Sequence, residues 1–138
     1  MSRLAVITCG PAIAPIDSVR RITNFATGEI GTLLAHELAS RRFQVICFRG
    51  EGSSAAAPAG VEVQKFTTNE SLALALRKLP RQPDVIFHAA ALCDFEVEKI
   101  EGAARHALHR HRHISLTRQQ DHRQIGIGLA DMVEKVEP

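Results

Sequence analysis

The sequence contains no tryptophan and no tyrosine, and aromatic residues make up only 4% of its 138 residues. Proteins that bind single-stranded nucleic acid usually stack bases on such side chains, so this class of function is disfavoured. A large excess of one charge is also missing, because the formal net charge is +2. We therefore expect neither nucleic acid nor an anionic membrane as a partner. No apolar run approaches the roughly 18 residues of a membrane span.

The first ten residues, MSRLAVITCG, lack the charged, apolar and cleavable regions of a secretory signal, which predicts a cytoplasmic protein. Only three cysteines are present, and each ends or follows an apolar run: Cys9, Cys47 and Cys93. An odd number of cysteines in a protein that is not exported argues against a disulfide framework. We predict that all three are small buried core residues, with a catalytic thiol as the less favoured alternative.

Short apolar runs dominate the first two thirds of the chain. Runs of this kind are typical of strands that are buried on both faces of a parallel sheet. Four are predicted: residues 4–8, 43–48, 61–66 and 84–88. After the first of them, a long connection without regular structure is expected until Thr27.

Two helices are predicted between these strands. Apolar residues recur at helical spacing over residues 28–41, with Thr27 as the N-cap. The second helix begins with a capping-box pattern at Thr67 and Glu70 and continues to Leu79. Alternating strands and helices predict an α/β fold: a doubly wound, Rossmann-like, mostly parallel sheet in a three-layer arrangement. The length allows one domain, residues 1–138.

The composition changes after Glu101. Residues 102–124 hold five arginines and five of the seven histidines, with a single acid. We interpret this segment as a basic loop or a poorly ordered insert. Within it, His109, His111 and His113 alternate and on a strand could chelate zinc or nickel, although a basic loop without function is favoured. Alternation near Ile125 predicts a further strand.

Ligands of doubly wound sheets bind beyond the carboxyl ends of the strands. Here these ends are expected at Cys9–Gly10, Arg49–Gly50 and Ala89–Ala91. The free N–H groups of the helix that begins at Thr27–Gly28 point to the same edge. Glycine spacing alone leaves two readings, phosphate binding and ordinary packing of a helix on a strand. The dinucleotide pattern G-x-G-x-x-G is missing, which disfavours an ordinary NAD site.

Two blocks of sequence are more specific than the glycines. The first, from Thr8 to Gly31, reads TCGPAIAPIDSVRRITNFATGEIG and contains P-I-D-x-V-R-x-I-T-N followed by T-G-x-x-G. The second, Ala89 to Phe95, reads AAALCDF. Both resemble the motifs of phosphopantothenate–cysteine ligases, the coenzyme A enzymes of the DNA/pantothenate metabolism flavoprotein type. The resemblance covers roughly residues 3 to 100, and the two blocks follow two predicted strands.

The resemblance implies a ligase of coenzyme A biosynthesis. A nucleoside triphosphate, CTP with Mg²⁺, would activate the carboxylate of 4'-phosphopantothenate as an acyl-nucleotide, and the amine of cysteine would then form the amide. Small-molecule substrates and a homodimer are implied as partners, and no metal-ligating residue is assigned to the chain. The family's later half is not recognised in the sequence, so a truncated or degenerate copy without activity stays open as the alternative to an active ligase.

Site residues are transferred by position from the resemblance. Asn24 would hold the acyl intermediate. The family's catalytic lysine would be Lys99, with His113 as the other candidate for that position. The remaining residues would bind nucleotide or substrate: Gly10, Asp17, Arg20, Thr27, Gly28, Gly31, Ala89, Ala90 and Asp94. His88, at a strand end, is read as a satisfied structural histidine rather than an acid–base catalyst.

A second class of function stays open beside the ligase. A non-catalytic nucleotide- or flavin-binding module of Rossmann type would use the same strand ends, because many ligases of this kind are fused to a flavin decarboxylase. FMN is the less favoured cofactor, since no decarboxylase segment fits into this length.

Overall fold

A computed structural model describes residues 2–101 and 113–118 of the chain. Its centre is a four-stranded sheet in the order β5-β4-β1-β6, in which all neighbouring strands run parallel. The four strands are listed in chain order: β1 (Leu4–Pro11), β4 (Gln44–Gly50), β5 (Glu62–Phe66) and β6 (Val85–Ala91). The four predicted strands are confirmed. Each of them except β5 continues further towards its carboxyl end than the apolar run indicated.

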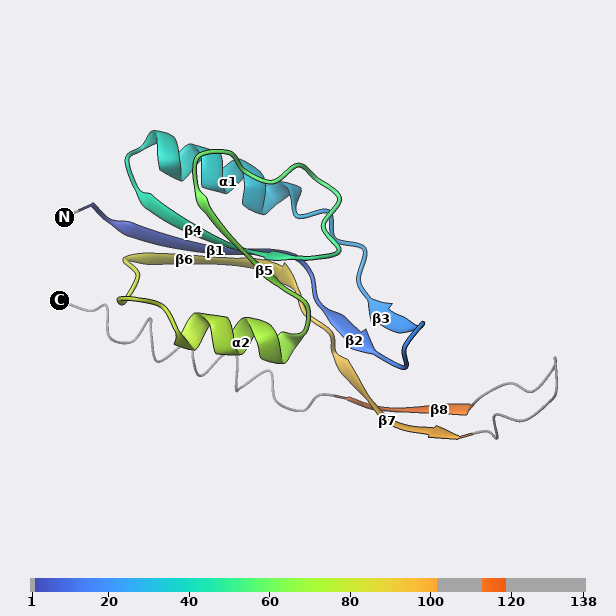
Figure 1. Cartoon of the computed structure of the whole chain (residues 1–138). Coiled ribbons are helices and arrows are strands. Elements are labelled where there is room, and N and C mark those ends of the chain that lie inside the picture. The colour runs from blue at the N-terminus through green and yellow to red at the C-terminus, as the bar shows by residue number, and fades with distance from the viewer. Residues whose placement is uncertain (1, 102–112, 119–138) are drawn as a thin grey trace.

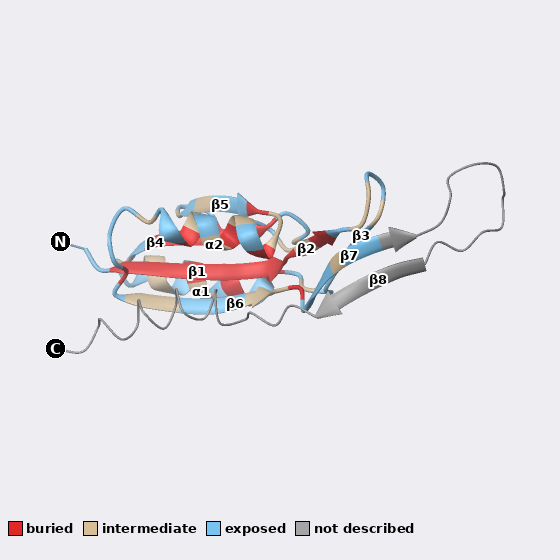
Figure 2. Ribbon diagram, turned by 90° about the horizontal axis from the view of Figure 1, so that it is seen from below, coloured by how far each residue is buried: buried red, intermediate tan, exposed pale blue. Residues whose placement is uncertain are grey.

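Helix α1 (Glu29–Ser40) covers one face of this sheet and α2 (Asn69–Arg77) covers the other (Figure 1). The predicted three-layer, Rossmann-like α/β arrangement is therefore confirmed. β1 is buried along its whole length because it lies between β4 and β6 and under both helices (Figure 2). Neither helix in the described part of the chain has the length and hydropathy that crossing a bilayer requires.

The core has two halves, one on each face of the sheet. On the α2 face, Phe48 is completely buried and packs with Leu4 and Leu72. On the α1 face, Ile7 packs with Ala35. Alternate residues of β1 therefore serve opposite halves of the core, as the two-residue period of a strand requires.

Two antiparallel hairpins extend from the carboxyl end of the sheet (Figure 1). The first joins β2 (Ile13–Pro15) and β3 (Arg21–Thr23), so the expectation of an irregular connection before Thr27 is wrong. Its strands have only three residues each and one contains a proline, which hides the two-residue alternation.

The second hairpin joins β7 (Phe95–Glu101) and β8 (His113–Arg118), with an irregularity in the pairing between Val97 and Lys99. The prediction of a loop over residues 102–124 is therefore wrong for β8. Its short apolar alternation is masked by the arginines and histidines around it. His109, His111 and the strand expected near Ile125 lie outside the described residues.

The N-terminus of α2 is fixed by a reciprocal capping box. Thr68 Oγ1 accepts a hydrogen bond from the backbone N–H of Ser71 at 3.1 Å, and Ser71 Oγ accepts one from Thr68 N–H at 2.9 Å. The capping box predicted at Thr67 and Glu70 is therefore wrong by one residue. Serine replaces the expected acid, because its hydroxyl can accept the same bond.

We expect Thr68→Ala to destabilise the domain by about 1 kcal/mol, because an N–H at the start of α2 would lose its acceptor. The matched control is Thr67→Ala, which leaves the box intact and is expected to change stability by less than about 0.5 kcal/mol. Urea unfolding measures both free energies. Equal losses in the two variants would contradict the assignment of the cap.

Candidate functional site

The start of α1 lies beside the carboxyl ends of β1 and β4. Gly28 is the N-cap of α1 and has a φ of 80°, a left-handed conformation that glycine adopts without strain. The expectation that Thr27 is the N-cap is wrong, because this turn delays the helix by one residue. Thr27 stays close by: its Oγ1 accepts a hydrogen bond from the N–H of Glu29 at 3.3 Å.

Gly10, at the end of β1, has a φ of 77° and faces the same place. A Cβ atom at Gly10 would overlap the hydroxyl of Ser53, and one at Gly28 would lie 2.9 Å from that hydroxyl and 3.0 Å from Nη1 of Arg49. The two predicted glycines are therefore brought together, against Ser53 and Arg49. Sequence reasoning missed both of these side chains, because each lies outside the two motif blocks.

The two motif blocks meet at Asn24. Its Nδ2 donates a hydrogen bond to the backbone carbonyl of Leu92 at 2.8 Å, across a separation of 68 residues. Asn24 itself is exposed, so its amide is also accessible to a ligand. The expectation that the two blocks lie at the same end of the sheet is supported by this contact.

Asn69, at the start of α2, fixes the segment that leads to Asp94. Its Nδ2 donates to the carbonyl of Cys93 at 2.8 Å, and its Oδ1 accepts from the N–H of Cys93 at 3.0 Å. The side chain is buried, so this paired amide is a structural anchor. Asp94 follows directly and is exposed. Asn69 was also missed by sequence reasoning, because polar residues are common at the start of a helix.

Ala89 and Ala90 lie on β6 in register with Cys9 and Gly10 of β1. Ala89 is exposed and Ala90 half-buried, so only methyl groups separate this part of β6 from solvent. A flat ligand could therefore approach the strand closely at the two predicted positions.

Asp17 and Arg20 lie in the turn between β2 and β3. The carboxylate of Asp17 accepts hydrogen bonds from Nε and Nη2 of Arg20 at 2.9 and 2.6 Å and from the N–H groups of Val19 and Arg20 at 3.0 and 2.9 Å. The Arg20 guanidinium and these N–H groups lower the pKa of Asp17 to about 2. The spacing of the D-x-V-R motif therefore closes the turn and fixes the direction of Arg20.

Because the folded pKa of Asp17 is below its ordinary value of 3.8, the pair supports the turn above that value and is lost as pH falls through about 2. We expect Arg20→Gln to raise the pKa of Asp17 towards 3.8, because the side chain of glutamine carries no charge. An NMR titration of the Asp17 carboxyl carbon measures this. An unchanged midpoint would contradict the pairing.

Lys99 lies on β7 opposite Ser115 of β8, in the second hairpin. This hairpin extends beyond the sheet, and β7 contacts β2 of the first hairpin (Figure 1). Lys99 is exposed. Its assignment as the catalytic lysine stays a prediction.

Gly31 packs the first turn of α1 directly on β1. A Cβ atom there would lie 2.7 Å from Sγ of Cys9. Cys9 and Cys47 are buried with their sulfur atoms 3.8 Å apart, and Cys93 is also buried and free. The prediction of buried core cysteines is confirmed. A hydrogen bond from Cys47 and the charge of Arg49 lower the pKa of Cys9 to about 7.

His88 lies on β6 with Nδ1 2.5 Å from the hydroxyl of Thr8, a buried residue of β1. His88 is exposed on the edge strand β6, and partial desolvation of the ring lowers its pKa, so the neutral form is favoured at pH 7. This arrangement agrees with the interpretation of His88 as a structural histidine.

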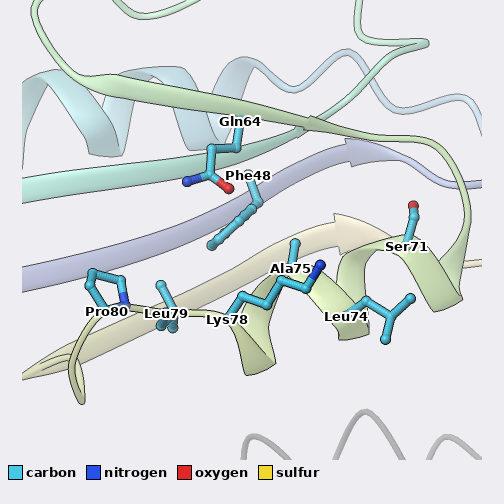
Figure 3. Close-up of a pocket in the computed structure, with 8 residues that line it drawn as sticks. All are labelled: Phe48, Gln64, Ser71, Leu74, Ala75, Lys78, Leu79 and Pro80. Carbon is cyan, nitrogen blue, oxygen red and sulfur yellow. The ribbon is translucent and has the colours of Figure 1, made fainter.

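Two cavities lie on the α2 side of the described structure. One, of about 260 Å³, lies between β2, the start of α2 and β7, and its lining includes Asn69, Cys93 and Phe95. It therefore borders the second motif block. The other, of about 350 Å³, lies between α2 and the strands β4 and β5, with Phe48, Gln64 and Lys78 in its lining (Figure 3). No predicted site residue lines this second cavity.

The described side chains do not fit a resident metal ion. Within residues 2–101 and 113–118, no three histidine, cysteine, aspartate or glutamate side chains gather at one place.

Comparisons with known proteins agree with the two motif blocks. Residues 2–127 match the family model of the DNA/pantothenate metabolism flavoprotein C-terminal domain. The coenzyme A biosynthesis bifunctional protein CoaBC of Mycobacterium tuberculosis is 35% identical over 101 residues, which are 73% of this chain and 24% of that protein. The corresponding protein of Methanocaldococcus jannaschii is 30% identical over 97 residues, 70% of this chain. The chain thus spans about a quarter of the length of these curated relatives.

Solved structures with the same fold are also found. The DNA/pantothenate metabolism flavoprotein from Streptococcus pneumoniae has a TM-score of 0.75 and 18% identity, over 87% of this chain and 62% of that one. A Cab2 mutant in complex with phosphopantothenate-cysteine has a TM-score of 0.57 and 20% identity, over 69% of this chain and 47% of that one. From its family match, its two motif blocks and its sheet, the chain belongs to the DNA/pantothenate metabolism flavoprotein C-terminal domain family, the phosphopantothenate–cysteine ligase family of coenzyme A biosynthesis.

Proposed function

We propose that the chain acts in coenzyme A biosynthesis as a phosphopantothenate–cysteine ligase domain that uses CTP, in the cytoplasm. The observation that carries this proposal is the hydrogen bond from Asn24 to the carbonyl of Leu92, which joins the two motif blocks of the family. The chain's membership of the family supports the class of reaction. The CoaBC relatives, which are coenzyme A biosynthesis proteins, support the proposed pathway. The Cab2 structure, whose ligand is phosphopantothenate-cysteine, supports the proposed substrate class.

The proposed reaction has two steps. A carboxylate oxygen of 4'-phosphopantothenate attacks the α-phosphorus of CTP, and pyrophosphate leaves. The amine of cysteine then attacks the acyl carbon, an amide forms and CMP leaves. Both steps bring anions together, so the chain must supply hydrogen-bond donors and positive charge where the phosphate groups lie.

The described residues offer such donors at one end of the sheet. The first turn of α1 directs N–H groups towards a ligand beyond Gly28, and the positive end of the helix dipole favours an anion there. The exposed amide of Asn24 would donate to the acyl-nucleotide, while Ala89, Ala90 and Asp94 would contact the nucleotide. We assign no ligand of Mg²⁺ to the chain.

A coupled assay that follows pyrophosphate release tests the proposal. The full chain is incubated with CTP, Mg²⁺, 4'-phosphopantothenate and cysteine, and each substrate is omitted in turn. We expect release that depends on both CTP and phosphopantothenate. CTP binding without release in any mixture would favour the alternative, a non-catalytic nucleotide-binding module, and absence of both would contradict the proposal. A purified protein with bound yellow flavin would favour the flavin-binding alternative.

A homodimer is part of the same proposal. Phe25 beside Asn24 is fully exposed, and Ile30 and Leu33 on the outer side of α1 are 68% and 62% exposed. Large apolar side chains at one end of a domain are typical of a surface that another chain covers. Light scattering of the purified chain tests the assembly, and a monomeric mass at micromolar concentration would contradict it.

A further inference from the structure

Arg49 is a buried cation next to the start of α1. It is the residue before the last of β4, and only 6% of its surface is exposed. Burying a guanidinium costs several kcal/mol unless an anion compensates the charge. Among the residues that the structure describes, the three ion pairs join Asp17 to Arg20, Glu37 to Arg41 and Asp84 to Arg81, and none includes Arg49.

The groups that hold Arg49 are formally neutral. Nη1 donates to the hydroxyl of Thr32 in α1 at 3.1 Å, and Nη2 donates to the carbonyl of Ala55 in the loop after β4. The N–H of Ala55 in turn donates to the carbonyl of Thr27 at 3.0 Å. These contacts fix the direction of the guanidinium and tie the loop to α1, but they do not cancel its charge.

The guanidinium lies beside the start of α1, where a phosphate is expected. Nη1 lies 3.0 Å from the position of a Cβ atom at Gly28, and Oγ of Ser53 lies 2.9 Å from it. The charge of Arg49 also contributes to the lowered pKa of the buried thiol of Cys9, because a cation favours an anion nearby. A buried and fixed cation that has no carboxylate partner among the described residues, and that lies beside a helix N-terminus, is an arrangement that an anionic ligand completes.

We propose that Arg49 is an anion-positioning residue, which compensates the charge of a phosphate group bound at the first turn of α1. This inference rests on the proposed function and extends it to a residue outside the motif blocks. The phosphate group belongs either to CTP or to phosphopantothenate, and the two substrates form separate arms of the test.

Calorimetric titrations of the full chain with CTP plus Mg²⁺, with 4'-phosphopantothenate and with inorganic pyrophosphate test the proposal. Arg49→Met removes the charge and is expected to lower the affinity for one of the two substrates about tenfold to hundredfold, because a charge-assisted hydrogen bond is lost. Arg49→Lys keeps the charge and is expected to restore part of this loss. The affinity of the wild type is expected to fall more steeply with salt than that of Arg49→Met. The matched control is Arg41→Met, an exposed arginine directly after α1, with a change below about twofold.

The outcomes separate this inference from the function. Equal affinities of wild type and Arg49→Met for every probe would overturn the role of Arg49 and leave the ligase proposal intact. Weaker pyrophosphate binding in Arg49→Met, in a chain that binds neither substrate, would support the role of Arg49 while contradicting the ligase. If Arg49→Met does not fold, Arg49→Gln gives the same comparison, with Arg49→Lys as its charged counterpart. Equal affinities of wild type, Arg49→Lys and Arg49→Gln overturn the proposal, and binding by Arg49→Gln that is at least about threefold weaker than by wild type supports it.

Discussion

Gly31→Leu is expected to destabilise the domain by about 3 kcal/mol or more, because the new side chain has no room between α1 and β1. A Cβ atom alone would overlap Cβ of Cys9, lie 2.7 Å from its Sγ and lie 3.4 Å from Cγ2 of Ile7. Cys9 and Ile7 are buried in the sheet and cannot move aside cheaply. Urea unfolding followed by circular dichroism measures the free energy.

The control for this substitution is His36→Ala in the same helix. His36 is exposed, so its loss is expected to change stability by less than about 0.5 kcal/mol. A second comparison adds Cys9→Gly to Gly31→Ala, which removes the atom that the new methyl group meets. The double variant is expected to lose less than the sum of the two single losses. If Gly31→Leu unfolds at the same urea concentration as the wild type, α1 does not pack on β1 as described.

Asn24→Ala is expected to lower the rate of pyrophosphate release about 100-fold, since the amide that would donate to the acyl-nucleotide is removed. The substitution also removes the hydrogen bond from Nδ2 to Leu92. Asn24→Asp keeps the shape but replaces the donor with a negative charge, so a loss at least as large is expected at pH 7. Initial rates at saturating substrate measure the effect on the bound complex.

Thr23→Ala is the matched control for Asn24. Thr23 precedes Asn24 in the chain and also donates one hydrogen bond to a carbonyl, that of Ala12 at 2.8 Å. Loss of this hydrogen bond disturbs the first hairpin to a similar degree, but the substitution removes no amide from the site. We expect less than about threefold lower rates. Equal losses for Thr23→Ala and Asn24→Ala would mean that Asn24 acts only through the position of the hairpin.

The sheet could be predicted from the sequence because its strands are buried on both faces. Such strands are nearly continuous apolar runs, and β1 is buried at every position. The hairpins could not be predicted in the same way. β2 and β3 have three residues each, and the pairing of β7 with β8 is irregular near Lys99, so neither shows a sustained alternation.

Helix boundaries were predicted to within about a turn, and the caps were not. At α1, a left-handed turn at Gly28 makes glycine the N-cap in place of Thr27. At α2, two adjacent threonines offer the same hydroxyl, and only the reciprocal bond with Ser71 selects Thr68. Neither choice is visible in a sequence pattern, because backbone geometry decides it.

In the candidate site too, the sequence pattern predicted some residues but not those whose role depends on folded contacts. Motif spacing placed Asn24 and Asp94 at one end of the sheet, and the bond to Leu92 agrees with that placement. Arg49 was placed at a strand end but was given no role, because an arginine after an apolar run is more often a solvated side chain. Its burial depends on Thr32 and on the loop at Ala55, which only the folded chain brings together.

The location of the nucleotide is tested most directly by an NMR titration of the ¹⁵N-labelled full chain with CTP and Mg²⁺. We predict that the largest shifts of backbone amides occur from Gly28 to Gly31 and at Asp94, with small shifts in the second half of α2. Arg49→Met, titrated in parallel, separates the charge of Arg49 from the rest of the site. Shifts that cluster around the groove of Phe48 and Lys78, or no shifts at millimolar CTP, would contradict a nucleotide site at the start of α1.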